Sequence, residues 1–231
     1  MRIPIAAAVE RVKKSHQTRR PRRPQRKILG ILGGLCALCV ITSYFFTGSV
    51  AVLGLVVTGH ATSSEVHGIA RVGDTPTANV VVWIDGPNVP MEKAAQPVLD
   101  QRNLGFSPRV LAVRVGTVVE FPNHDRVFHN VFSFHDGKQF DLGLYPTGTV
   151  KHILFDKPGL SQLLCNIHPH MAAYIMAVDS PYFAVSDKDG AFTIRGLAPG
   201  TYTYHTWRPG GTETTGTATI APATRLEIPC R

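Results

Sequence analysis

A chain of 231 residues is long enough for one large domain or two small ones. Its net charge of +8 would suit a nucleic-acid-binding protein, but ten of the 24 Lys and Arg lie in residues 1–27, against the single Glu10. The remaining 14 basic side chains face 15 acidic ones, so the part of the chain that can fold is not basic and nucleic-acid binding is not expected.

An apolar segment follows the basic tail directly. No charged side chain occurs from Ile28 to Val57, and this run is longer than the roughly 20 residues that a membrane-spanning helix needs. We therefore predict one transmembrane helix within residues 28–58, with residues 1–27 as a cytoplasmic tail and the rest of the chain in the periplasm or another extracytoplasmic space. The small residues Gly59 and Ala61 leave an alternative, a signal segment cleaved near Ala61 that releases a secreted protein.

The cysteines are compatible with export. Cys36 and Cys39 lie inside the apolar segment, which leaves Cys165 and Cys230 to the exported part, where a disulfide between them is allowed. Cys230 is the penultimate residue, and we expect the chain to fray there.

From Thr62 onward the pattern is one of strands and turns. Runs rich in β-branched and aromatic residues alternate with Gly, Pro, Asn and Asp, and no convincing amphipathic helix appears. We predict an all-β sandwich or barrel. The runs are 78–85, 109–121, 129–134, 149–155, 160–165, 172–178, 191–197 and 201–207.

One short loop concentrates metal-binding side chains. The stretch CNIHPHM places Cys165, His168 and Met171 between two predicted strands, and His129 opens another strand. A site of two His and one Cys with a weak axial Met is the copper arrangement used for electron transfer. The pattern therefore predicts one copper site with these four ligands.

Other interpretations of these residues stay open at this level. Cys165 could be a buried small apolar residue, or a nucleophile activated by a histidine. Zinc would be another metal, although zinc gains little from methionine. His170 lies between the predicted ligands and is expected to face outward, and Met176 is expected in the core.

These residues resemble a known family, the cupredoxins or blue-copper proteins. The shape "FPN…HNV" followed by "PG…CNIHPHM" is similar to plastocyanin and, more closely, to amicyanin-like proteins over about Gln96 to Asp179. "DQRNLGFSPRVLAVRVGTVVEFPN" and "FDLGLYPTG" further resemble exported, methylamine-utilisation-like cupredoxins. The resemblance implies a cupredoxin Greek-key β-sandwich over residues 96–179.

The same resemblance assigns roles to individual residues. His129, Cys165 and His168 would be equatorial copper ligands and Met171 the axial one, in one type 1 site that alternates between Cu(I) and Cu(II). Asn130 would connect the two ligand-bearing loops by hydrogen bonds. Redox partner proteins would dock near His168. An apolar patch there would be lined by Pro169, Ala172 and Ala173.

The flanking segments resemble a second family. Residues 62–95 and 180–231, with "DKDGAFTIRGLAPGTY", look like the two halves of a carboxypeptidase-regulatory-like, prealbumin-like β-sandwich into which the copper domain is inserted. The alternative is one enlarged cupredoxin followed by a β tail. Asp187, Asp189 and Gly190 are interpreted as a plain turn, because a full calcium loop is missing.

The expected function is that of a membrane-anchored electron carrier rather than an enzyme. A copper protein for storage, delivery or sensing of the metal is the alternative. The electron donor and acceptor and the oligomeric state are left open.

Overall fold

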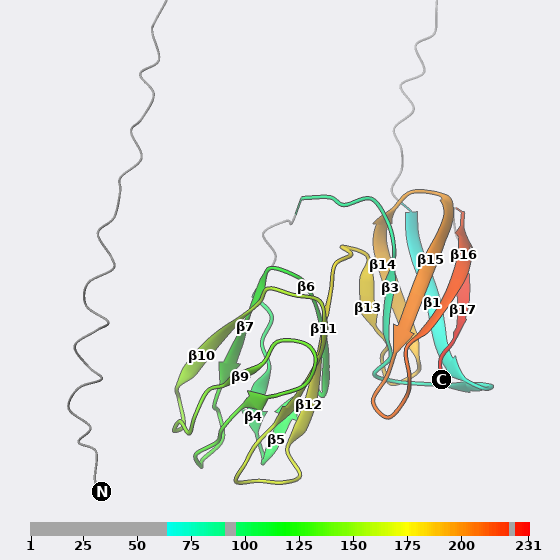
Figure 1. The fold of residues 1–231 in the computed structure, drawn as a ribbon. Helices are drawn as coiled ribbons and strands as arrows, with labels where there is room; N and C mark the ends of the chain where they lie inside the picture. The colour runs from blue at the N-terminus through cyan, green and yellow to red at the C-terminus, as the bar shows by residue number, and fades with distance from the viewer. Residues whose placement is uncertain (1–63, 91–95, 222–224) are drawn as a thin grey trace, which may run out of the picture. The chain divides into compact units, whose positions relative to one another are not determined.

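The computed structural model describes residues 64–90, 96–221 and 225–231, which fold into strands, turns and loops (Figure 1). Within these ranges no helix has the length and apolar character required to cross a membrane. The predicted tail at residues 1–27, the anchor at residues 28–58 and the alternative cleavage site near Ala61 lie outside the described residues.

The described residues contain 17 strands. In chain order they are β1 (Ser64–Val72), β2 (Thr75–Pro76), β3 (Val81–Ile84), β4 (Asp100–Arg102), β5 (Gly105–Ser107), β6 (Val110–Arg114), β7 (Thr117–Pro122), β8 (Phe132–Ser133), β9 (Phe140–Asp141), β10 (Val150–Phe155), β11 (Gly159–Leu164), β12 (Ala172–Val178), β13 (Phe183–Val185), β14 (Ala191–Leu197), β15 (Gly200–Trp207), β16 (Thr214–Ile220) and β17 (Arg225–Pro229).

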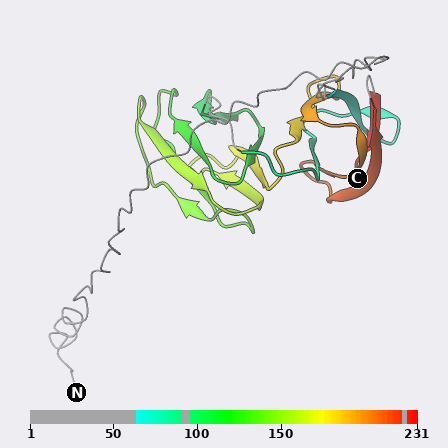
Figure 2. The ribbon, with the colours of Figure 1, turned by 90° about the horizontal axis from the view of Figure 1, so that it is seen from above.

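The first and last strands of this set form one β-sandwich. One sheet has the order β14-β1-β17, with β2 beside β1, and the other has the order β13-β3-β15-β16. Strand β1 pairs antiparallel with β14 and parallel with β17, so residues from both ends of the described chain interleave. In Figure 2 these strands are coloured cyan (β1), orange (β14) and red (β17). Two of the C-terminal strands, β14 and β17, therefore share a sheet with β1.

The middle strands form a second β-sandwich. Its larger sheet has the order β6-β12-β11-β8-β9, and β10 pairs with β7 and β4 with β5 in separate short sheets. The core between them contains Phe121, Phe155 and Leu163, all fully buried. Alternate residues of β12 point into this core, including Ala173 and Ile175, as expected for a strand with one face against it. The all-β prediction is confirmed.

The run of residues 109–121 is two strands and not one. Gly116 sits at the break with a φ of 92°, a conformation that glycine adopts without steric cost. The chain turns there, so that β6 joins the large sheet and β7 pairs with β10. Hydrophobic content alone did not show this turn, because valines stand on both sides of it.

Cys230 corrects the expectation of a frayed C-terminus. Its side chain is buried, its N–H donates to the carbonyl of Arg71 at 2.8 Å, and its thiol contacts the same oxygen at 2.9 Å. Burial raises the pKa of this thiol. Cys165 and Cys230 are both free thiols in the two separate cores, so the structure contains no disulfide between them.

The turn from Asp187 to Gly190 is held by the chain itself. One carboxylate oxygen of Asp187 accepts hydrogen bonds from the N–H groups of Asp189 and Ala191, each at 2.9 Å. Gly190 has a φ of 75°, and a Cβ there would come within 2.8 Å of the nitrogen of Thr77. The interpretation as a plain turn agrees with this geometry.

Candidate metal centre

The loop from Cys165 to Met171 is fixed at both ends by the large sheet. Strands β11 and β12 pair antiparallel up to Leu164 and Ala172, so Cys165 leaves one strand where Met171 enters the next. Within the loop the N–H of Met171 donates to the carbonyl of His168 at 2.9 Å. The loop is thus a closed turn that carries its three candidate ligands on a rigid base.

His129 reaches the same place from a different part of the chain. Its backbone exchanges two hydrogen bonds with Tyr145, and β8, which follows it, pairs Phe132 with Leu164 at the end of β11. Tyr145 is itself anchored, because its ring is buried and its hydroxyl donates to the carbonyl of Phe121 at 3.2 Å. These contacts hold the fully buried His129 beside the cysteine loop.

The ligand atoms of three predicted residues converge. Nδ1 of His129 lies 3.0 Å from Nδ1 of His168, and Sγ of Cys165 lies 4.0 Å from the first and 3.8 Å from the second. Metal–nitrogen and metal–sulfur bonds of about 2.0 and 2.3 Å, as found for zinc, separate trigonal ligand atoms by about 3.5 to 3.8 Å. Two of the three separations match this range within 0.2 Å, and the histidine pair is closer. Among the described residues this is the one group of His, Cys, Asp and Glu of that kind.

Met171, the predicted axial ligand, is buried with 1% of its surface exposed. It packs in the same apolar core as Cys165. A thioether at this position is a weak, soft ligand, and the soft thiolate and two imidazoles are the donor set that suits copper. The residues present therefore fit a copper ion.

Asp125 is a residue that the sequence analysis missed. Its carboxylate lies 3.0 Å from Nε2 of His129, on the side of the ring away from Cys165, and it also accepts the N–H groups of Leu104 and Arg126. The two backbone donors, first that of Leu104, lower the pKa of this carboxyl to about 2. The sequence shows only that Asp125 lies four residues before His129. In a loop this spacing does not predict a contact, so the pair is recognised only once the fold is known.

Asn123, and not Asn130, makes the hydrogen bonds that organise the loop leading to His129. The fully buried Asn123 donates to the carbonyls of Val127 and Tyr145, at 2.9 and 3.1 Å, and accepts from the N–H of Asp125 at 3.0 Å. Asn130 instead donates to Asp141 at 2.9 Å. Its described contacts do not reach the cysteine loop, so the role implied for it by resemblance differs from the structure.

The apolar surface near His168 also differs from expectation. Ala173 is fully buried because it is an inward-facing residue of β12, so it cannot line a docking surface. Exposed apolar side chains instead lie within two residues of a candidate ligand in the chain or, for Leu144, next to Tyr145, which pairs with His129. We call them the apolar rim: Val127, Phe128, Leu144, Ile167 and Pro169. Phe128 is 56% exposed.

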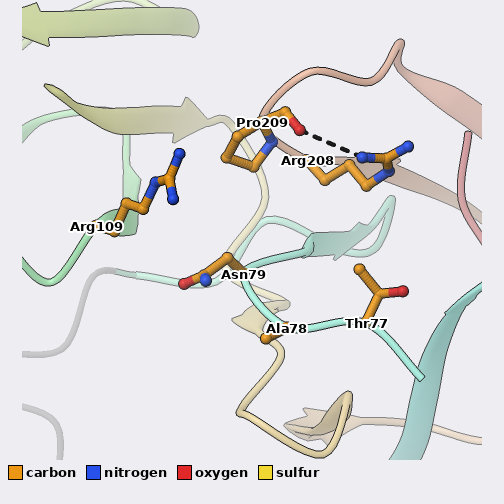
Figure 3. A pocket seen from close by; sticks show the side chains of 6 residues that line it. All are labelled: Thr77, Ala78, Asn79, Arg109, Arg208 and Pro209. Carbon is orange, nitrogen blue, oxygen red and sulfur yellow. Dashed lines mark hydrogen bonds between the residues drawn. The ribbon is translucent and has the colours of Figure 1, made fainter. Parts of the chain in front are cut away.

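Two remaining features lie outside this cluster. His170 is exposed and Met176 is buried, as predicted. A surface pocket of about 190 Å³ is lined by none of the candidate ligands (Figure 3). Its lining residues are Thr77, Ala78, Asn79, Arg109, Arg208 and Pro209.

Comparisons with known proteins add the following. No model of a known family matches the chain, and no curated protein matches it. Solved structures match part of the chain. A purple cupredoxin from Nitrosopumilus maritimus is 27% identical, with a TM-score of 0.33, over 37% of this chain and 100% of its own. An oxidized amicyanin variant is 19% identical, with a TM-score of 0.34, over 37% of this chain and 87% of its own.

A third similar structure is a copper-containing nitrite reductase from Thermus scotoductus. It is 24% identical, with a TM-score of 0.36, and the match covers 41% of this chain and 25% of that one. The present chain thus spans a quarter of the reductase. These three structures are similar to between 37% and 41% of this chain.

Proposed function

We propose that this chain is an exported, membrane-anchored type 1 copper protein that carries single electrons between redox partners and is not an enzyme. The observation that carries the proposal is the convergence of the ligand atoms of His129, Cys165 and His168. The copper, when bound, supplies a one-electron couple between Cu(I) and Cu(II).

The protein's own residues explain why such a couple would exchange electrons quickly. A carrier must hold its ligands in nearly one arrangement in both oxidation states. Here Cys165 and Met171 are fixed by paired strands, and His129 is fixed by Tyr145. His168 is the half-buried member of the set and lies beside Ile167 of the apolar rim, so electrons would leave or enter there.

The membrane anchor and location are part of the same proposal and rest on the sequence of residues 1–58. The basic tail would stay in the cytoplasm, while the copper site would face the other side. Protease added to membrane vesicles of known orientation would digest the part after residue 58 only from the extracytoplasmic side. Digestion from the cytoplasmic side would overturn this placement.

Voltammetry of the copper-loaded full chain tests the electron-carrier function. We expect one reversible one-electron wave. In the Met171→Leu variant the wave should move to higher potential, because losing the thioether donor destabilises Cu(II) more than Cu(I). Since Leu and Met have similar volumes, stability should change by less than about 1.5 kcal/mol.

Met176→Leu is the matched control, because it makes the same exchange at a buried position of β12 outside the ligand loop. Its wave should not move. Equal shifts of the potential in both variants would show that Met171 is not a copper ligand. Copper binding with no reversible wave in the unaltered chain would favour metal storage or delivery instead.

The apolar rim is the proposed docking surface for the redox partner. Weak electron-transfer contacts are small, and an exposed apolar patch beside a ligand provides them at little desolvation cost. We expect Ile167→Glu to slow electron self-exchange between the Cu(I) and Cu(II) forms by roughly five- to tenfold. The reason is that a like-charge pair brought together costs on the order of 1 kcal/mol even in water.

Self-exchange is measured by NMR line broadening in mixtures of the two forms. Leu154→Glu, an exposed apolar residue of β10 in the same β-sandwich, is the control with the same charge change. An equal effect of both substitutions would mean that net charge, and not this surface, governs the rate.

A further inference from the structure

The contacts of Asp125 suggest a role beyond that of an ordinary surface carboxylate. Its side chain is 12% exposed, and its partner His129 is fully buried. One oxygen accepts both the N–H of Leu104, at 2.7 Å, and Nε2 of His129, at 3.0 Å. The other oxygen accepts the N–H of Arg126 at 2.8 Å.

These contacts leave one consistent tautomer for the neutral imidazole. Both oxygens of Asp125 already accept backbone N–H groups, so the carboxylate acts as an acceptor toward His129 as well. In the neutral ring the proton is therefore on Nε2. Nδ1, which faces Cys165 and His168, is then the unprotonated nitrogen that a metal requires.

The hairpin turn between β4 and β5 provides one of these donors. Its two loop residues, Asn103 and Leu104, have positive φ, 52° and 57°, as a two-residue hairpin turn of type I′ requires. The result of the turn is that the N–H of Leu104 points to the Asp125 carboxylate.

We propose that Asp125 is a positioning residue that fixes the Nε2–H tautomer of His129 and places a carboxylate behind this ligand. The inference rests on the proposed copper site and adds to it. A negative charge next to a ligand favours Cu(II) over Cu(I), so Asp125 holds the reduction potential down. Loss of a partner of this kind typically costs about 10- to 100-fold in metal affinity.

The first test needs no metal. In the copper-free full chain at pH 8, long-range proton–nitrogen NMR correlations report the tautomer of His129. We expect Nε2–H in the unaltered protein and loss of this preference in Asp125→Ala, with recovery in Asp125→Glu. An Nδ1–H tautomer in the unaltered protein would overturn the proposal, whether or not copper binds.

The second test uses copper. Asp125→Asn keeps an acceptor oxygen but removes the charge, so Cu(II) affinity should fall by about 10- to 100-fold with Cu(I) affinity nearly unchanged. Each tenfold fall in the Cu(II) affinity relative to the Cu(I) affinity raises the reduction potential by about 59 mV. Asp156→Asn, which removes a charge paired with Lys138 in the same β-sandwich, is the control and should leave both affinities unchanged.

The outcomes separate the two proposals. An unchanged potential and unchanged Cu(II) affinity in a folded Asp125→Asn protein would refute the role of Asp125 while leaving the copper site intact. Failure of the unaltered chain to bind copper through Cys165 would refute the proposed function, and the tautomer measurement would still decide what Asp125 does.

Discussion

Cys165→Ser should abolish the intense visible absorption of the Cu(II)-loaded chain. This band arises from charge transfer between a thiolate sulfur and Cu(II), and a hydroxyl oxygen is a hard ligand that does not supply it. Cys165 is the described cysteine whose sulfur lies within 4.0 Å of two imidazole nitrogens, so no other described thiol can replace it. The measurement is an absorption spectrum after addition of one equivalent of Cu(II).

Cys230→Ser is the matched control for this substitution. Cys230 is also a buried free thiol, but it lies in the other core and contacts the carbonyl of Arg71. Its replacement should leave the band unchanged. A band that survives Cys165→Ser would contradict the assignment of the sulfur ligand.

Asn123→Ala is expected to loosen the ligand-bearing loop even without metal. The substitution leaves the carbonyl of Val127 and the N–H of Asp125 without their partner, and it removes one of the two donors to the carbonyl of Tyr145. Losing such buried hydrogen bonds costs about 2 to 4 kcal/mol. Amide hydrogen exchange across residues 123–130 should become roughly 30-fold faster or more, since 1.4 kcal/mol corresponds to a factor of ten.

Asn166→Ala serves as its control, because Asn166 is an exposed residue of the cysteine loop. Exchange in the control should match that of the unaltered protein. If Asn123→Ala also exchanged at the unaltered rate, the loop would be held by other contacts than those of Asn123, and its role as an organiser would be wrong.

The ligand set could be proposed from the sequence because it is mostly local. Cys165, His168 and Met171 lie within seven residues, and their donor types indicate copper before any fold is known. The strand-rich pattern likewise showed that both ends of the loop would be held by a sheet. Local spacing and ligand chemistry thus carried most of the candidate site.

The contacts around the site could not be read in the same way. Asp125 reaches His129 because the β4–β5 turn holds it, and that turn lies some 20 residues earlier in the chain. Asn123 and Asn130 are chemically identical and both buried, and only the fold shows that Asn123 bonds to Val127 while Asn130 bonds to Asp141. The parallel pairing of β17 with β1, which buries Cys230, is equally non-local.

The burial of Ala173 could not be predicted from the strand pattern. Residues of a strand alternate between its two faces, and Ile175 and Ala177 share the inner face with Ala173. Met176 and Val178, on the other face of β12, are buried as well. Because both faces of β12 carry buried apolar residues, the apolar run does not show on which face Ala173 lies.

The measurement that tests the central claim most directly is an electron paramagnetic resonance spectrum of the full chain loaded with one equivalent of Cu(II). A ligand set of His129, Cys165 and His168 predicts a narrow copper hyperfine splitting, because the unpaired electron is shared with the thiolate sulfur. A wide splitting typical of copper bound by nitrogen and oxygen alone would contradict a type 1 site and, with it, the proposed electron-carrier function.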